Sequence, residues 1–462
     1  MSTPPARGGV VLLAVLLSTL TFPLAITGAS VALPAVGAEL GGGPTALQWV
    51  VNSYNACFAA FLVCAGSVAD SVGRRRVYAA GVLLFCAAGL LCLFARDVAV
   101  LNLFRAVGGV GAAAAVAGGG AMLAATFEGS ARARAFGLLG TVLGAGTAFG
   151  PAVAGLLVDT LGWRAAFAAP AVVAGLALAL VPLMPAARGT GRPVDRPGAV
   201  LFTSALAVLI AALVEGPARG LPVVLAGLAV SALLLAAFVL VERRSPEPLV
   251  DVALLGNRRF VAYALAAAVF MAVLVPLLVY LPSYLIAVVG LGAAQAGLWL
   301  LMLTGPTLFL PALGAELAAR LPHTAVVAGA LVLCGAGSAG LLVLGPDATP
   351  WTLLLPFLLI GVGVGLTNGT VDGMAMGVVG VERTGVAAGV FNATRIIVET
   401  VALACAGAVL AALTGGRLEG EGFTEAFHVV ALALAGVAAL AAAGVLVLGG
   451  RGEKEPEKSP LS

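Results

Sequence analysis

Long apolar runs dominate this chain, and they constrain its fold more than any other feature. A membrane-spanning helix needs about 20 mostly apolar residues, and the 462 residues contain fourteen such runs. Only 10% of the residues are charged, against roughly 25% in a soluble domain. The predicted spans are 10–36, 47–69, 77–95, 98–123, 135–158, 165–185, 198–214, 221–241, 260–289, 294–319, 324–345, 350–378, 385–413 and 426–449. The sequence therefore predicts an all-α integral membrane protein.

The positions of lysine and arginine predict how these spans are oriented. With fourteen spans and both termini in the cytoplasm, eighteen of the 24 basic residues lie in cytoplasmic segments. Only four lie outside, namely Arg96, Arg164, Arg219 and Arg417. Positive residues concentrate on the cytoplasmic side of membrane proteins, and the loss of one span would invert every later loop. The bias therefore supports the count of fourteen.

Several functional classes are disfavoured by what the sequence contains. It has no Gly-x-x-x-x-Gly-Lys phosphate loop, no Gly-x-Ser-x-Gly elbow and no His-Glu-x-x-His motif. The longest polar stretches, 186–197 and 242–259, are too short for a catalytic domain. Six cysteines within the spans and two distant histidines do not suggest a metal site or a cofactor, and a net charge of +3 does not indicate nucleic-acid binding. The prediction is a non-enzyme in a lipid bilayer.

The spans are arranged as six, two and six. Six precede the Arg/Pro-rich segment 186–197, two short ones follow it, and six more follow the basic segment 242–259. The predicted units are an N-terminal six-helix bundle over 1–185, a linker with two extra transmembrane helices over 186–258, a C-terminal six-helix bundle over 259–450 and a cytoplasmic tail over 451–462.

A glycine- and arginine-rich loop joins the second and third predicted spans. Its pattern Gly-x-x-x-Asp-x-x-Gly-Arg-Arg consists of Gly66, Asp70, Gly73, Arg74 and Arg75. Gly66 and Gly73 allow close helix approach and a tight turn. Asp70 lies at the end of a membrane helix, where a charge is expensive without a partner. The pattern resembles the signature loop between helices 2 and 3 of the major facilitator superfamily, which implies a gating role.

The fifth predicted span carries a second glycine pattern. It consists of Gly137, Gly146, Gly150, Pro151 and Gly155. Gly146 and Gly150 form a small-x-x-x-small surface, for which ordinary tight packing is the alternative explanation. The order of these residues resembles the antiporter motif of exporting members of the superfamily, with Ala154 in place of one usual glycine.

The resemblance extends to the six-two-six plan. An extra central pair of helices resembles the fourteen-helix drug:proton antiporter branch of the superfamily. This implies two six-helix bundles that rock around a central site and expose it alternately to each side of the membrane. It also implies protons and a small-molecule substrate as partners. Ala32-Leu33-Pro34 matches the branch, but Ala25 stands where its first-span aspartate is expected.

Charged residues inside the other spans are the candidates for proton coupling. Arg105 resembles the buried arginine motif of the family, and the alternative is an arginine that snorkels toward the outer surface. Arg395 and Glu399 are four residues apart near mid-membrane, so Arg395 would tune the carboxyl of Glu399. An ion pair that only stiffens the helix is the alternative. Asp372 is the second candidate acid, and an interfacial carboxylate is its alternative.

Polar side chains in two spans are candidates for substrate binding. Asn52 and Asn55 share a face of the second span, where they could also only join helices by hydrogen bonds. Asn368 and Asp372 are predicted to share a face of the twelfth span, beside one straight ridge of glycines. The ridge residues are Gly361, Gly365, Gly369, Gly373 and Gly377.

Together these features predict a secondary active transporter. It would export a hydrophobic small molecule, a drug or an antibiotic, from a bacterial cell in exchange for protons. A proton-linked carrier of a specific metabolite is the first alternative. A membrane sensor that transports nothing is the second, and the missing acid at Ala25 is its best support.

Overall fold

The computed structural model describes residues 5–186, 189, 195–245, 254, 256–379, 384–415 and 420–449, and these are all helical or in connecting turns. Thirteen helices in this part of the chain are long and apolar enough to cross a membrane. The all-α prediction is confirmed. The predicted tail over 451–462 lies outside the described residues.

Helices α1 to α6 form the first half of the molecule. Their bounds are α1 Pro5–Leu40, α2 Pro44–Val72, α3 Arg74–Leu91, α4 Val98–Thr126, α5 Gly129–Leu161 and α6 Trp163–Leu180. Local chemistry sets several boundaries. The Asp97 carboxylate accepts a 2.8 Å hydrogen bond from the backbone N–H of Val100 and so caps α4. Gly162, with φ +82°, makes the turn between α5 and α6.

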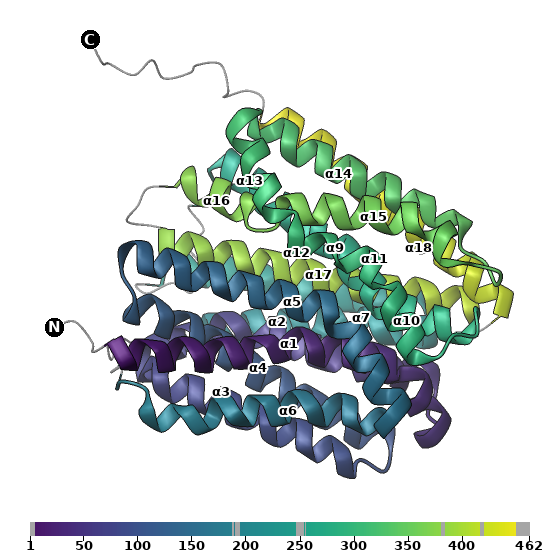
Figure 1. Cartoon of the computed structure of the whole chain (residues 1–462), viewed down its shortest axis with the longest axis horizontal. Coiled ribbons are helices and arrows are strands. Elements are labelled where there is room, and N and C mark those ends of the chain that lie inside the picture. Colours follow the sequence, from purple (N-terminus) through teal and green to yellow (C-terminus); the bar gives the residue numbers. More distant parts are fainter. Residues whose placement is uncertain are drawn as a thin grey trace.

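Helices α9 to α18 form the second half. Their bounds are α9 Arg258–Ala287, α10 Ala293–Trp299, α11 Leu301–Thr304, α12 Pro306–Phe309, α13 Pro311–Arg320, α14 His323–Gly340, α15 Pro350–Thr367, α16 Thr370–Gly377, α17 Thr384–Thr414 and α18 Gly420–Gly449. Helix α9 is the central one, since 83% of its apolar stretch is buried inside the protein. The beginning of α1 and the end of α18 lie on the same, left-hand side of Figure 1.

The predicted span 294–319 is not one continuous helix. It is divided into α10, α11, α12 and α13, which follow one another in a diagonal row in Figure 1. Pro306 and Pro311 each begin a new short helix, because proline has no N–H to continue the hydrogen-bond pattern of the helix before it. The predicted span is therefore a row of four short helices rather than one helix, and the count of fourteen spans stays a prediction.

The predicted glycine ridge of span 350–378 is also wrong as a straight ridge. The chain leaves the helix between α15 and α16, where Gly369 has φ +78°. Gly361 and Gly365 pack against the backbone of α11 and α12. No heavy atom lies within 4 Å of the positions where a Cβ would stand on Gly373 or Gly377. Only the α15 part of the ridge makes close contacts.

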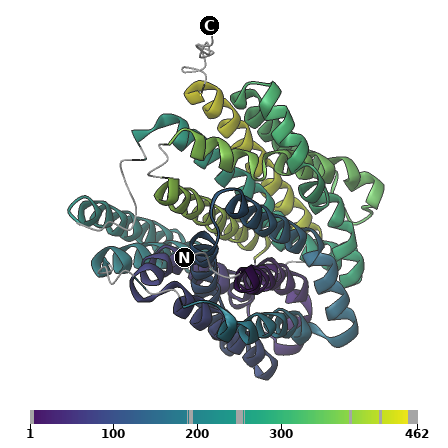
Figure 2. The ribbon, with the colours of Figure 1, turned by 60° about the vertical axis from the view of Figure 1, so that its left-hand side comes forward.

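A helical hairpin, α7 (Arg196–Arg219) and α8 (Leu221–Glu242), lies at the edge of the molecule. In Figure 2 it is the teal pair at the left. Helix α7 contacts both α2 and α17, so the hairpin touches both halves. Only 11% of the apolar stretch of α8 is buried, which leaves the remainder for lipid.

Candidate functional site

One face of α5 lies along the boundary between the two halves. Seven of its residues are three or four positions apart, so they share that face and form what we call the α5 stripe. The α5 stripe consists of Gly137, Gly140, Gly144, Ala148, Pro151, Gly155 and Asp159. Its two ends have different surroundings, and this difference defines the conformation of the protein.

The second part of the α5 stripe is packed tightly against the other half. The Ala148 carbonyl accepts a 2.8 Å hydrogen bond from the buried Thr304 hydroxyl. Pro151 lies against Gly297. A Cβ added to Gly297 would collide with the Pro151 carbonyl oxygen. Gly155 lies equally close to the backbone of Ala293. Figure 1 shows α10 beside this end of α5.

Asp159 completes this contact. Its carboxylate accepts hydrogen bonds from the backbone N–H groups of Ala293, at 3.3 Å, and Ala294, at 2.8 Å. These are the otherwise unpaired donors at the start of α10. Gln48 adds a bond across the same boundary, from its side-chain nitrogen to the Gly407 carbonyl, at 2.9 Å. We call this end of the molecule the closed end.

The first part of the α5 stripe has no such neighbours. Among the described residues, no heavy atom outside the backbone of α5 lies within 4 Å of the Cβ positions of Gly137, Gly140 or Gly144. The two halves therefore touch at the closed end and separate toward the end where α1 begins. We call the latter the open end.

The other glycines of the antiporter-like pattern point elsewhere. Gly146 and Gly150 face α1, and a Cβ on Gly150 would lie 2.6 Å from the Thr27 hydroxyl. This contact is inside the first half. The five residues of the pattern thus fall into two groups, one at the boundary between the halves and one within a bundle.

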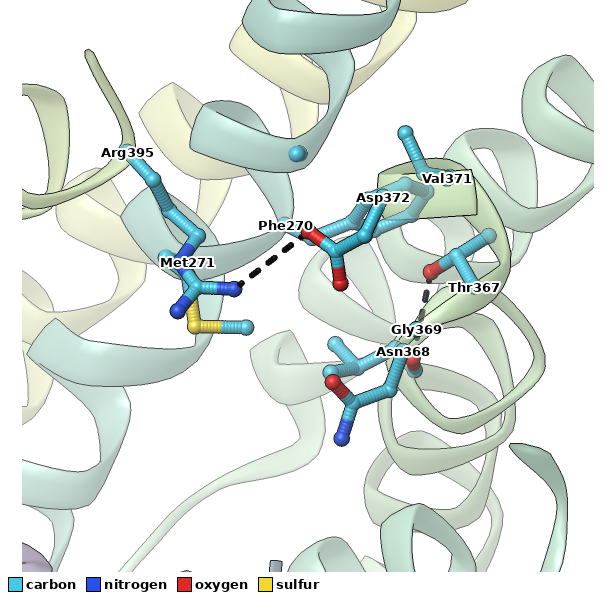
Figure 3. Close-up of a pocket in the computed structure, with 10 residues that line it drawn as sticks. Phe270, Met271, Thr367, Asn368, Gly369, Val371, Asp372 and Arg395 are labelled. Atoms are coloured by element: carbon cyan, nitrogen blue, oxygen red, sulfur yellow. Dashed lines mark hydrogen bonds and ion pairs between the residues drawn. The ribbon is translucent and has the colours of Figure 1, made fainter. Parts of the chain in front are cut away.

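A small pocket in the second half contains the candidate acid Asp372. Figure 3 shows Arg395 of α17 reaching toward the Asp372 carboxylate of α16, at 3.9 Å. Asn368 lines the same pocket, together with Phe270 and Met271 of α9. The Asp372 side chain is 40% exposed and that of Arg395 is 24% exposed, so water reaches both charges.

Arg395 forms its ion pair with an acid of another helix rather than with Glu399. The sequence places Glu399 one turn further along α17, on the face that carries Arg395. In the structure Glu399 is partly buried. The structure thus brings Asp372, Arg395 and Asn368 together, and Glu399 follows one turn deeper.

Arg105 lies in a different place, inside the first half. Its side chain is 4% exposed, and its Nε donates a 2.9 Å hydrogen bond to the Val50 carbonyl. Its guanidinium lies 4.4 Å from the centre of the Tyr54 ring and 5.4 Å from that of Phe167. The snorkelling alternative is wrong, because the charged group turns into the bundle.

The loop between α2 and α3 lies at the open end. Arg74 forms an ion pair with Asp70 at 3.2 Å, and Arg75 donates to the Pro182 carbonyl at 3.2 Å. Gly73 has φ +123°, as a tight turn requires. The close approach expected at Gly66 is absent, since no heavy atom lies within 4 Å of its Cβ position.

The candidate polar residues of α2 lie at the contact with α17. Asn52 is fully buried and donates a 3.1 Å hydrogen bond to the Gln48 carbonyl. Asn52 Oδ1 and Asn55 Nδ2 are buried and form no close hydrogen bond with the described residues, although the Tyr280 side chain lies beside Asn52. The Gln48 bond to α17 shows that this polar face of α2 joins helices. The buried side-chain atoms of Asn52 and Asn55 can still form hydrogen bonds with water or a substrate.

Sequence reasoning missed Asp159 as a contact between the halves. Its position four residues after Gly155 placed it on the α5 stripe. No local signal identified its partners, because the N–H groups of Ala293 and Ala294 are 134 and 135 residues away in the chain.

Two bundles of apolar helices that meet at one end and separate at the other are an architecture found in membrane transporters. The sequence model of the Major Facilitator Superfamily matches residues 15–402. The chain belongs to this superfamily and is therefore a multi-pass bacterial membrane transporter, not an enzyme.

Curated relatives carry names of resistance or export proteins. The chain is 34% identical to the puromycin resistance protein pur8 of Streptomyces alboniger, over 95% of this chain and 89% of the relative. It is 34% identical to the multidrug resistance protein Stp of Mycobacterium tuberculosis, over 84% and 73%. The cephamycin export protein CmcT of Amycolatopsis lactamdurans is 34% identical over 86% and 83%.

Solved structures agree on the fold. An auto-inhibited peptide transporter of the POT family superposes with a TM-score of 0.72 at 18% identity, over 99% of both chains. At this identity the likeness concerns the fold alone.

Proposed function

We propose that the protein exports a hydrophobic antibiotic or drug in exchange for protons by alternating access. The observation that carries this proposal is the contrast along the α5 stripe, tightly packed near Gly155 and unpacked near Gly144. Two halves that rock against each other need a helix face that contacts the other half at one end and is free of it at the other end. The names of the relatives support an antibiotic as the exported compound.

The proposal includes the orientation and the division of the chain. The row α10 to α13 counts as the fourteenth crossing, which leaves both termini in the cytoplasm. The open end then faces the cytoplasm, and the structure is the state that takes up substrate for export. The six-helix bundles 1–185 and 259–450 move against each other, and 186–258 with its two extra helices connects them.

The residues proposed for each role come from both halves. Glu399 is proposed to carry the coupled proton, with Arg395 and, by resemblance, Arg105 in the same proton-coupling group. Asp372 is the second candidate acid of this group, and its main proposed role is to recognise cationic substrates, which its ion pair with Arg395 and its 40% exposed side chain support. Asn368 beside that pair, and Asn52 and Asn55 at the α2–α17 contact, are proposed to bind substrate.

The proposal is tested with purified protein in lipid vesicles, with puromycin as the probe. An imposed pH gradient should drive puromycin uptake into inside-out vesicles, and an internal pH-sensitive dye should report proton release in step with it. Puromycin movement that ignores the pH gradient would contradict proton coupling. A panel of unrelated antibiotics distinguishes a drug exporter from a carrier of a specific metabolite, because the metabolite carrier should move none of them.

Asp70→Asn is expected to abolish transport while the protein still reaches the membrane. The change removes the charge that pairs with Arg74 at the open end and leaves the helix ends in place. Gating would lose one of its electrostatic contacts. Vesicle uptake and membrane abundance are the measurements, and Glu128→Gln, at the start of α5, is the control. Wild-type uptake by Asp70→Asn would remove Asp70 from the gate.

A further inference from the structure

Arg105 is a buried positive charge for which the described part of the chain provides no negative partner. No carboxylate of the described residues lies within 4 Å of it, and its Nη2 is buried without a hydrogen-bond acceptor. Arginine does not lose its proton in proteins. The charge therefore persists at a depth of about 10 Å from the start of α4, where an uncompensated ion is expensive.

The acids of the first half all lie at the ends of helices, away from Arg105 along the chain. Residues 1–186 contain five acidic residues, namely Glu39, Asp70, Asp97, Glu128 and Asp159. Each of them lies within the last three positions of a helix or just before its first residue. Glu39 pairs with Arg164, Asp70 with Arg74, and Asp159 with the start of α10. The interior of this bundle contains an arginine and no acid.

A cavity lies next to this arginine. Its volume is about 20 Å³, which is enough for one group the size of a water molecule. Small residues leave the space open, because Ala25, Gly89 and Gly108 line it. Tyr54 also lines the cavity, and its buried hydroxyl has no hydrogen-bond partner among the residues that the structure describes. Two unpaired donors therefore belong to side chains around one small space.

We infer that this cavity is a binding site for a small monovalent anion of about the size of chloride. The anion would accept hydrogen bonds from the Arg105 guanidinium and the Tyr54 hydroxyl, and it would neutralise the arginine. The aromatic side chains of Phe85, Phe104 and Phe167 also line the cavity, and these apolar surroundings strengthen the attraction between the two charges. The anion can be a free halide or the end of a carboxylate, and these two sources are distinguished below.

The first test measures thermal stability of the purified protein at constant ionic strength, with chloride replacing isethionate, a larger anion without a carboxylate. Saturating chloride should raise the melting temperature by about 3 °C, and bromide should act similarly. Arg105→Gln should remove this dependence. The exposed Arg219→Gln should retain it, since Arg219 lies at the end of α7. An equal melting temperature in chloride, formate and isethionate for the parent protein would overturn the inference.

The second test supplies the missing charge from the chain itself, in case Arg105→Gln does not fold. Ala25 lines the cavity, so Ala25→Asp should place a carboxylate beside Arg105 and abolish the chloride effect. Ala25→Asn has nearly the same size and no charge, and it should not substitute for the anion. Chloride dependence that persists in Ala25→Asp would contradict the site.

The source of the anion is decided by a competition. If formate and acetate stabilise the parent protein at lower concentrations than chloride, the site takes a carboxylate end. If only halides act, it takes a free halide. Tyr54→Phe should raise the half-maximal anion concentration about tenfold, as the loss of one hydrogen bond to a charged group predicts. An unchanged value would remove Tyr54 from the site.

Discussion

Glu399→Gln is expected to stop uphill export while downhill exchange of substrate continues. A glutamine has nearly the shape of glutamate but cannot bind and release a proton. A gradient of one pH unit can drive about tenfold accumulation for each proton exchanged, and this accumulation should fall to about onefold. Wild-type accumulation by the variant would place the proton site elsewhere.

The measurement compares two assays on the same vesicles. Counterflow of labelled against unlabelled puromycin reports exchange, and uptake driven by a pH gradient reports accumulation. Glu421→Gln is the matched control, because Glu421 is an exposed glutamate in the first turn of α18. Loss of both assays in Glu399→Gln would indicate a structural defect rather than lost coupling.

Asp372→Asn separates the second acid from the first. Its amide cannot match the charge of Arg395, which then keeps no acid within ion-pair distance among the residues that the structure describes. We expect weaker recognition of cationic substrates, seen as a higher KM for puromycin, and retained accumulation of neutral ones. An equal loss of accumulation for cationic and neutral substrates would contradict this role and would mean that Asp372 acts with Glu399 in proton coupling.

Leucine at two positions of the α5 stripe should shift the protein in opposite directions. In Gly155→Leu the side chain collides with the backbone of Ala293, so the closed end should open. In Gly144→Leu the side chain enters free space in this state and obstructs the closure of the open end. Overpacking costs about 1–3 kcal/mol, which is about 5- to 150-fold in a two-state equilibrium.

Distances between pairs of spin labels report these shifts. Labels at Leu161 and Leu298 span the closed end, and labels at Phe136 and Leu313 span the open end; all four side chains are exposed. Gly120→Leu is the control. Gly120 has no atom within 4 Å of its Cβ position and lies on α4. Identical distance distributions for both α5 variants would contradict a rocking boundary at this helix.

The existence and order of the helices could be predicted because length and apolarity are local properties. A stretch of about 20 apolar residues must satisfy its backbone hydrogen bonds within itself in lipid, and a helix does so. The same local reasoning failed for 294–319. Pro151 lies inside a continuous α5, whereas Pro306 begins a new short helix. Whether a proline interrupts a membrane helix depends on its neighbours, which the sequence does not show.

The candidate site divides in the same way. Spacing placed Gly155 and Asp159 on one face of α5, but only the tertiary structure showed α10 as the neighbour of that face. Spacing also suggested Glu399 as the partner of Arg395, and the structure supplies Asp372 of another helix. By itself the sequence determined that the chain forms many membrane-spanning helices, that it carries the superfamily signature, and that no acidic residue lies between Asp97 and Glu128. The tertiary structure decided the partner of each charge, because contacts between residues far apart in sequence follow from how the helices pack.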